Sequence, residues 1–222
     1  MPVALPQLPG KSVVQMYKLI REHRVKHLEN VFTDYLLLAI CWEETKFNNV
    51  FQGGSGGTGI GFGQVEPANF YMLESDMARQ RGYYVPGLPE RTQTKNGKGK
   101  VIKTASSRML SERESIQTQS ALLCHLYHSS KTPTKRGALS AYAGVGFSKT
   151  GGTDNLGDNK RRHIVDGWLA CEHMLAENWD YPADPVDIAN ALRKSRAFPS
   201  RKLDPRYEDT LFPPEDKGWW TP

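Results

Sequence analysis

The sequence predicts a mainly helical domain, or an α+β domain with a very small sheet. Apolar residues recur at helical spacing in several segments, whereas alternating strand–helix units are absent. Seven glycines between Gly53 and Gly63 interrupt this pattern and predict a single glycine-rich hairpin or loop. The chain has 222 residues, which is enough for one good-sized domain, or for one domain plus an appendage.

The second expected helix forms the centre of the predicted fold. The first, over 11–30, has one apolar stripe between basic side chains and is typical of a surface helix. The second begins at a cap, Thr33 or Asp34, and runs to about Lys46 with apolar residues on every side. We therefore expect it to be buried. The residues expected in the core around it are Leu37, Ile40, Cys41, Leu123, Tyr127, Trp168 and Cys171.

The later segments predict shorter helices and one long loop. Ser111 and Glu114 have the spacing of a capping box, which opens a helix to about Ser130. Residues 84–108 are rich in Pro, Gly and Lys and predict a long loop. The remaining expected helices are 70–83, 137–147, 161–178 and 184–196.

Composition excludes several classes of protein. Three cysteines, Cys41, Cys124 and Cys171, have no pairing scheme and no metal-ligand spacing, and we expect buried free thiols. The longest apolar run, 35–42, is far shorter than the roughly twenty residues that a transmembrane helix needs. The first ten residues have no basic region before an apolar stretch, so we expect no classical signal peptide.

The net charge of +5 favours a polyanionic partner such as nucleic acid, an anionic membrane or the bacterial cell wall. No nucleic-acid recognition motif is present, and the one dense basic stretch, 91–103, has the composition of an exposed loop. His23 and His27 have ligand spacing without an HExxH order, and His125 and His128 have no evident partners. No metal or organic cofactor is therefore expected.

Glu44 is the candidate general acid. It follows Leu37, Ile40 and Cys41 at helical spacing and shares their face of the second helix. A carboxylate that ends an apolar helix is expected to be partly desolvated, and desolvation raises the pKa of a carboxylic acid. Glu43 lies about 100° around the helix, so the two acids should not share a site. The alternative is that both are solvated residues at a helix end.

Two further segments carry candidate ligand contacts. The glycine-rich stretch 53–67 contains a G-x-G-x-x-G string, but no predicted βαβ unit surrounds it, which argues against a nucleotide site. Its glycines permit close backbone approach to a ligand beside Gln64 and Glu66, and the alternative is a flexible loop. The small residues of 137–146 permit close helix packing with the Tyr142 phenol in a cleft, and the alternative is core packing.

Three short motifs thus occur in order along the chain. The first is Glu-Thr-Lys-Phe-Asn at 44–48, the second is Gly-Phe-Gly-Gln-Val at 61–65, and the third is Ala-Leu-Ser-Ala-Tyr-Ala-Gly at 138–144. Together they resemble the lysozyme-like superfamily, in particular lytic transglycosylases and goose-type lysozymes. There a helix ends in an acid followed by Ser, a spacer and Phe. A hairpin ending in Gly-Leu-Met-Gln and an Ala-Leu-Ala-Ala-Tyr-Asn-Ala-Gly motif follow. The resemblance covers roughly residues 34–178.

This resemblance implies both a fold and an activity. It implies a lysozyme-like catalytic domain over 34–180, with the glycine-rich hairpin lining a cleft. Residues 1–33 would be a helical lead-in, and residues 181–222 a C-terminal helix and Pro-rich tail packed on the same domain. Glu44 would donate a proton to the glycosidic oxygen between N-acetylmuramic acid and N-acetylglucosamine in peptidoglycan. The substrate-binding residues that it implies are Thr45, Phe62, Gly63, Gln64 and Tyr142, the last two orienting the glycan or Glu44.

The step after proton donation has two alternatives in the families that the chain resembles. In transglycosylases the muramic 6-hydroxyl attacks the anomeric carbon and leaves a 1,6-anhydro end. In goose-type lysozymes an acid on the hairpin is proposed to activate water, and Glu66 stands where these enzymes carry an Asp. An inverting hydrolase needs its two carboxyl groups about 6.5–9.5 Å apart. We favour hydrolysis with Glu66 as the base, and the alternative is that Glu66 is a surface acid.

Three positions depart from the family pattern. Thr45 replaces Ser and keeps the hydroxyl group. Gly63 replaces Met and is expected to open the wall beside the acid. Ala143 follows Tyr142 where the family has Asn, so a substrate contact is lost or supplied elsewhere.

The expected setting is lysis of the bacterial cell wall, in the periplasm or outside the cell, by a phage lysin or an antibacterial effector. A delivery machine and an immunity or inhibitor protein are the partners that such an effector implies. The runner-up activity is a chitinase- or chitosanase-like glycosidase. A basic glycan-binding module without catalysis is the non-enzymatic alternative, against which an intact Glu44 counts.

Overall fold

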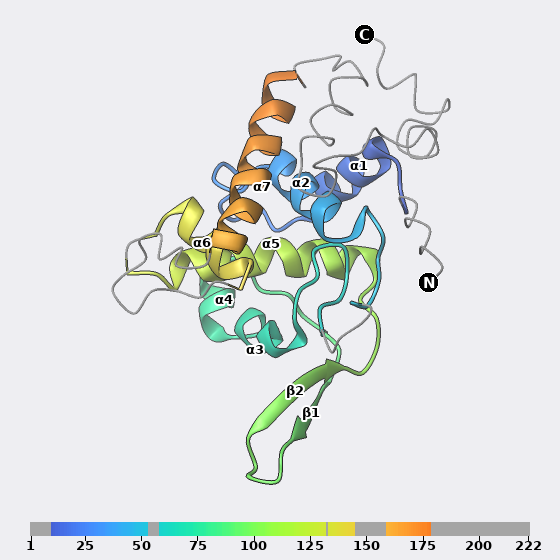
Figure 1. Cartoon of the computed structure of the whole chain (residues 1–222), viewed down its shortest axis with the longest axis vertical. Helices are drawn as coiled ribbons and strands as arrows, with labels where there is room; N and C mark the ends of the chain where they lie inside the picture. The colour runs from blue at the N-terminus through green and yellow to red at the C-terminus, as the bar shows by residue number, and fades with distance from the viewer. Residues whose placement is uncertain (1–9, 53–57, 132, 145–158, 179–222) are drawn as a thin grey trace.

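A computed structural model of the chain describes residues 10–52, 58–131, 133–144 and 159–178. These ranges contain seven α-helices, one short 3₁₀-helix and one antiparallel two-stranded hairpin (Figure 1), which confirms the predicted mainly helical class. The elements in chain order are α1 (Val13–His23), α2 (Asp34–Thr45), η1 (Pro67–Asn69), α3 (Phe70–Leu73), α4 (Asp76–Arg81), β1 (Arg91–Lys95), β2 (Val101–Ser106), α5 (Glu112–His128), α6 (Lys135–Tyr142) and α7 (Asn159–Asn178).

Helix α2 is buried along most of its length, as its all-round apolar sequence predicts. The Thr33 hydroxyl caps it by accepting a hydrogen bond from the backbone amide of Leu36. Every side chain from Leu36 to Trp42 is fully buried, and the helix packs against α1 and α7 (Figure 1). It ends where Lys46 and Phe47 adopt left-handed backbone conformations, which reverses the chain and buries the Phe47 ring.

Helix α5 crosses the middle of the molecule and packs against α1, α3 and α6 (Figure 1). The predicted capping box is present, with Ser111 and Glu114 each satisfying the other's backbone amide. A buried polar contact ties α5 to α2. The Cys41 thiol donates to the Gln119 side-chain oxygen at 3.1 Å, and the Gln119 amide donates to the Leu37 carbonyl at 3.4 Å.

The predicted core is confirmed with one exception. Leu37, Ile40, Cys41, Leu123, Trp168 and Cys171 are buried, whereas Tyr127 is half-buried near the end of α5. All three cysteines are buried and free. The core includes residues of α1 as well as of α7, so the lead-in packs on the same body as the helices that follow it.

Several predicted boundaries were wrong. Residues 84–108 are not a long loop, because strands β1 and β2 pair within them as an exposed hairpin. The strands of the sheet therefore lie outside the glycine-rich segment, whose described residues contribute isolated bridges of Ile60 to Phe51 and Val65. The first helix ends at His23 rather than near residue 30, and 70–83 holds two short helices. The helix expected over 184–196 and the tail lie outside the described residues.

In the part of the chain that the structure describes, no helix has both the length and the apolar character needed to cross a membrane.

Candidate active site

Glu44 and Glu43 leave the end of α2 in different directions. Glu44 is exposed, and its negative charge contributes to a raised pKa of Tyr142 in α6. Glu43 is half-buried with one carboxylate oxygen enclosed, and its charge contributes to the raised pKa of Cys171 in α7. The charges of the two acids thus act on groups in different helices, in keeping with their angular spacing on α2. The expectation that Glu44 is partly desolvated was wrong, because the surrounding elements leave its side of the last helical turn open to solvent.

Thr45 joins the end of α2 to the second motif. Its buried hydroxyl lies 2.9 Å from the Phe62 carbonyl and 3.1 Å from the Cys41 carbonyl one turn back in the helix. The Phe62 amide in turn donates to the Ser115 hydroxyl of α5 at 2.7 Å. Phe62 itself is fully buried, so its ring anchors the segment in the core and does not face solvent. A hydroxyl at position 45 therefore fixes the acid-bearing helix end against residues 61–65.

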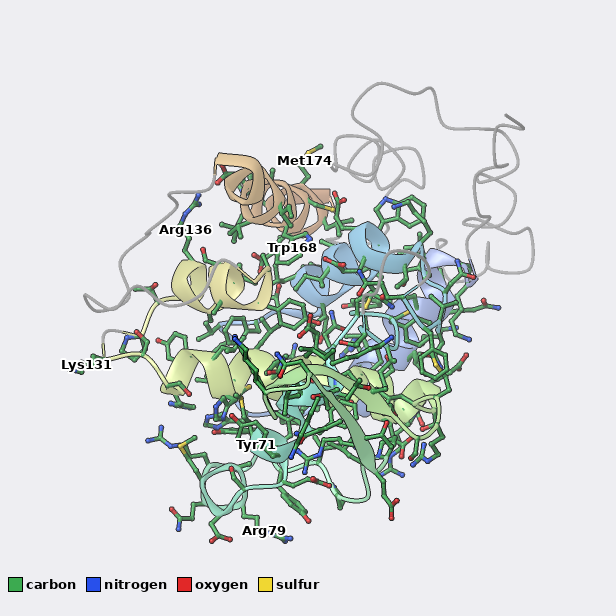
Figure 2. The ribbon with its side chains drawn as sticks, turned by 60° about the horizontal axis from the view of Figure 1, so that its bottom comes forward. Tyr71, Arg79, Lys131, Arg136, Trp168 and Met174 are labelled. Carbon is green, nitrogen blue, oxygen red and sulfur yellow. The ribbon has the colours of Figure 1, made fainter. Side chains whose placement is uncertain are left out.

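Tyr142 joins the third motif to the same segment. The phenol hydroxyl donates to the Gly63 carbonyl at 2.6 Å, and the ring packs edge-on against Trp168 at 5.9 Å. Figure 2 shows Trp168 on the inner side of α7. A Cβ atom at Gly63 would lie 2.6 Å from the Tyr142 hydroxyl and 2.8 Å from the Gln119 side chain. The expectation that Gly63 opens the wall beside the acid was therefore wrong, because Tyr142 and Gln119 occupy that space.

Gln64 occupies a strained turn beside this contact. Its φ of 53° lies in the left-handed region, and its side-chain amide donates to the carbonyls of Gly61 at 2.9 Å and Val50 at 3.1 Å. Four non-glycine residues among the described ones have positive φ, and three of them, Lys46, Phe47 and Gln64, belong to the motif segments. Backbone strain of this kind is concentrated at functional sites in proteins.

The electrostatics of the helix end follow from burial and from the two carboxylates. Burial raises the pKa of Tyr142 well above its ordinary value, and the negative charge of Glu44 adds to this effect. The phenol therefore remains a hydrogen-bond donor throughout the neutral range. Burial lowers the pKa of Lys46, and the carboxylates of Glu43 and Glu44 partly offset this effect.

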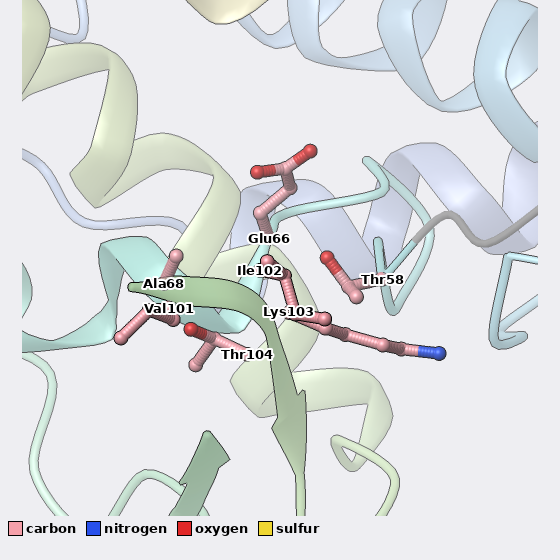
Figure 3. Close-up of a pocket in the computed structure, with 7 residues that line it drawn as sticks. All are labelled: Thr58, Glu66, Ala68, Val101, Ile102, Lys103 and Thr104. Atoms are coloured by element: carbon pink, nitrogen blue, oxygen red, sulfur yellow. The ribbon is translucent and has the colours of Figure 1, made fainter. Parts of the chain in front are cut away.

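Glu66 lies in a different set of contacts. It is exposed, directly precedes η1, and lines a surface pocket of about 360 Å³ together with residues of β2 (Figure 3). Its carboxylate points away from Ala68, Val101 and Thr104 (Figure 3). A second pocket of about 190 Å³ shares Thr58 and Lys103 with the first, and the two together are termed the groove, which lies between β2 and residues flanking the glycine-rich segment. Glu44 lines neither of these two pockets.

A histidine cluster is a polar feature that the sequence analysis missed. His27 and His128 place their Nε2 atoms 2.5 Å apart, His128 Nδ1 contacts the Arg81 guanidinium, and His125 contacts the Tyr83 hydroxyl at 3.4 Å. Burial lowers the pKa of all three histidines. The expectation that His125 and His128 lack partners was wrong, because Tyr83, Arg81 and His27 reach them from segments that are distant in the sequence. Among the described residues, no three His, Cys, Asp or Glu side chains converge as metal ligands do.

No family model matches the chain, and no curated protein and no solved structure matches it. The resemblance to lysozyme-like enzymes therefore stays a prediction from the three sequence motifs.

Proposed function

We propose that the chain is a peptidoglycan glycosidase that cleaves the β-1,4 bond between N-acetylmuramic acid and N-acetylglucosamine, with Glu44 as the general acid. One observation carries the proposal. Segments 44–48, 61–65 and 138–144 meet through the hydrogen bonds of Thr45 to Phe62 and of Tyr142 to Gly63. Three motifs that resemble one family in sequence order are thus joined in space.

The chemistry of the helix end supports Glu44 in this role. The side chain is exposed, so an incoming glycan can reach it, and its charge acts on the Tyr142 phenol. As a bond to the leaving oxygen breaks, a carboxylic acid at Glu44 would supply the proton and positive charge would develop at the anomeric carbon. Covering Glu44 with a glycan would remove water from its carboxyl group, and such desolvation favours the protonated form that a general acid needs.

The attacking group has two candidates, and we favour water activated by Glu66. The support is an exposed carboxylate two residues after the strained Gln64, in a groove with room for a ligand. In the other branch the muramic 6-hydroxyl attacks, and the product is lighter by one water. In both branches Thr45, Phe62, Gly63 and Gln64 act by fixing the backbone beside Glu44. Thr45 bonds the Phe62 carbonyl, Tyr142 bonds the Gly63 carbonyl, and the Gln64 side chain bonds the Gly61 carbonyl.

The deciding experiment is digestion of purified peptidoglycan followed by mass spectrometry of the soluble products. Wild-type protein should release disaccharide-containing fragments, and Glu44→Gln should reduce release by about 10²–10⁴-fold while melting at the wild-type temperature. Glu43→Gln is the matched control, because it removes an adjacent charge that faces α7 instead of Tyr142. Full activity of folded Glu44→Gln refutes the proposal. A requirement for Glu43 with a dispensable Glu44 means that the acid is one residue earlier.

The same mass spectra decide whether water or the muramic 6-hydroxyl attacks the anomeric carbon. Free reducing ends that disappear in Glu66→Gln support hydrolysis. Dominant 1,6-anhydro ends together with a fully active Glu66→Gln show that the muramic hydroxyl attacks. Release of fragments from chitin or chitosan but not from peptidoglycan would identify the chitinase-like alternative. Binding of glycan without cleavage of any of these polymers would identify a non-catalytic module.

A further inference from the structure

The positive charge of the chain is concentrated in hairpin β1–β2. Residues 91–106 hold five Lys and Arg side chains and no acidic one: Arg91, Lys95, Lys98, Lys100 and Lys103. The chain has 29 Lys and Arg against 24 Asp and Glu, so the other 24 cationic side chains balance the acids. The hairpin thus carries the whole formal net charge of +5.

The hairpin presents these charges to solvent. It extends away from the helices (Figure 1), and every residue from 91 to 103 is exposed. None of its cations makes an ion pair within the described ranges. A cluster of like charges without ion-pair partners repels itself, and a polyanion relieves that repulsion on binding.

The tip of the hairpin is held in a defined shape. The Asn96 side-chain oxygen accepts hydrogen bonds from the amides of Lys98 and Lys100, each at 3.0 Å. The Asn96 amide donates to the Lys100 carbonyl at 2.9 Å, and Gly99 takes the positive φ that the turn requires. The backbone that carries Lys95, Lys98 and Lys100 is therefore ordered before any ligand arrives, which lowers the entropy cost of binding.

The hairpin also adjoins the groove that Glu66 lines. Lys103 of β2 contributes to both pockets of that groove, and Thr58 lies in both of them as well (Figure 3). An anionic group would be repelled by Glu66 and attracted to the tip lysines. A ligand that is neutral along one part and anionic along another therefore fits this arrangement better than a uniformly charged chain does.

We propose that hairpin β1–β2 is a cationic arm that binds the carboxylate-bearing peptide stems of peptidoglycan while the uncharged sugar backbone lies toward Glu66. The inference rests on the proposed function, and it names the part of that substrate that the arm takes. Nucleic acid fits less well, because residues 91–106 contain no aromatic side chain on which a base could stack.

The test measures binding, without cleavage, to two forms of the same polymer. The probes are purified sacculi with intact peptide stems and the same sacculi after methyl esterification of their stem carboxylates, which removes the negative charge and keeps the polymer. The tip variant Lys95→Gln, Lys98→Gln, Lys100→Gln is compared with a control that changes three exposed lysines elsewhere, Lys18→Gln, Lys26→Gln, Lys131→Gln. Both sets remove the same charge, and the tip set spares Lys103 in the groove. Each variant is placed in the Glu44→Gln background, so that the polymer stays intact.

The tip variant should bind intact sacculi about tenfold more weakly than the control does, and added salt should erase the difference. On esterified sacculi the two variants should bind alike. Equal binding of both variants to intact sacculi overturns the inference. It also fails if tip-dependent binding to duplex DNA, or to vesicles of phosphatidylcholine and phosphatidylglycerol, is tighter than binding to intact sacculi.

The two proposals fail separately. If wild-type protein releases no fragments but binds intact sacculi through the hairpin tip, the glycosidase proposal is refuted and the proposal that the hairpin binds peptide stems is retained. If wild-type protein releases fragments and the tip variant binds like the control, the arm is refuted and the glycosidase proposal stands.

Discussion

Replacing Gly63 by Ala tests the contact that joins the second and third motifs. The added Cβ would lie 2.6 Å from the Tyr142 hydroxyl and 2.8 Å from the Gln119 side chain, whereas ordinary contact begins at 3.4 Å. The neighbours must therefore move apart by about 0.6–0.8 Å. Neither neighbour can move freely, because Tyr142 packs on Trp168 and Gln119 is hydrogen-bonded to Cys41.

The expected loss of stability in Gly63→Ala follows from these two contacts. Overpacking a buried site costs about 1–3 kcal/mol. Loss of the hydrogen bond from Tyr142 to the Gly63 carbonyl adds about 1 kcal/mol. In a chain of this size each kcal/mol lowers the melting temperature by about 2–4 °C. We therefore expect Gly63→Ala to melt roughly 5–15 °C below the wild type.

The assay is thermal unfolding followed by circular dichroism, together with release of fragments from peptidoglycan. Gly97→Ala is the matched control, since nothing lies within 4 Å of a Cβ atom at that exposed turn, and its effect should stay within about 0.5 kcal/mol. Tyr142→Phe removes the closest atom. Gly63→Ala should therefore cost less in the Tyr142→Phe background, with a coupling of about 1 kcal/mol.

Two results would refute this reasoning. One is a Gly63→Ala protein that melts at the same temperature as Gly97→Ala, which would mean that the space beside Gly63 is open. The other is a Gly63→Ala cost that is unchanged by Tyr142→Phe, which would place the strain somewhere other than the phenol hydroxyl.

Two further predictions concern the helix end and the histidine cluster. Thr45→Val leaves the Phe62 carbonyl without its hydroxyl donor and should cost about 1–3 kcal/mol in denaturant unfolding, whereas Thr45→Ser keeps the donor and should cost less. Burial depresses the pKa of His27, His125 and His128 below 6.5. As the pH falls, these histidines therefore become protonated in the unfolded chain before they do so in the folded protein. The contribution of these histidines to the free energy of unfolding should be fully present above about pH 6.5 and should decrease as the pH drops below it. His128→Gln should weaken the dependence of the melting temperature on pH. An unchanged dependence would contradict the role given to the histidine cluster.

Features that depend on neighbours in the chain were predictable. The all-round apolar sequence of 35–42 predicted that α2 is buried, and the spacing of Ser111 and Glu114 predicted the start of α5. Helix caps and helical faces involve residues one turn apart, so the sequence alone contains them. The different directions of Glu43 and Glu44 follow from the same geometry.

The hairpin over 91–106 escaped prediction for a physical reason. A strand is recognised in a sequence by apolar residues that alternate with polar ones, because one face is usually buried. Every residue of β1 is exposed, so this alternation is missing, and the Lys and Gly residues of the turn are typical of a loop. Backbone pairing between the strands formed the hairpin, in which Thr104 of β2 is the one buried residue.

The sequence by itself determined which chemistry the site could hold, namely an acid at a helix end, a glycine-rich turn and a tyrosine among small residues. Tertiary structure alone decided that Thr45 meets Phe62, that Tyr142 fills the space beside Gly63, and that Glu44 is exposed. These outcomes depend on how segments up to about eighty residues apart pack together. Local periodicity carries no information about such contacts, because it specifies the face of a helix and not the partner that covers it.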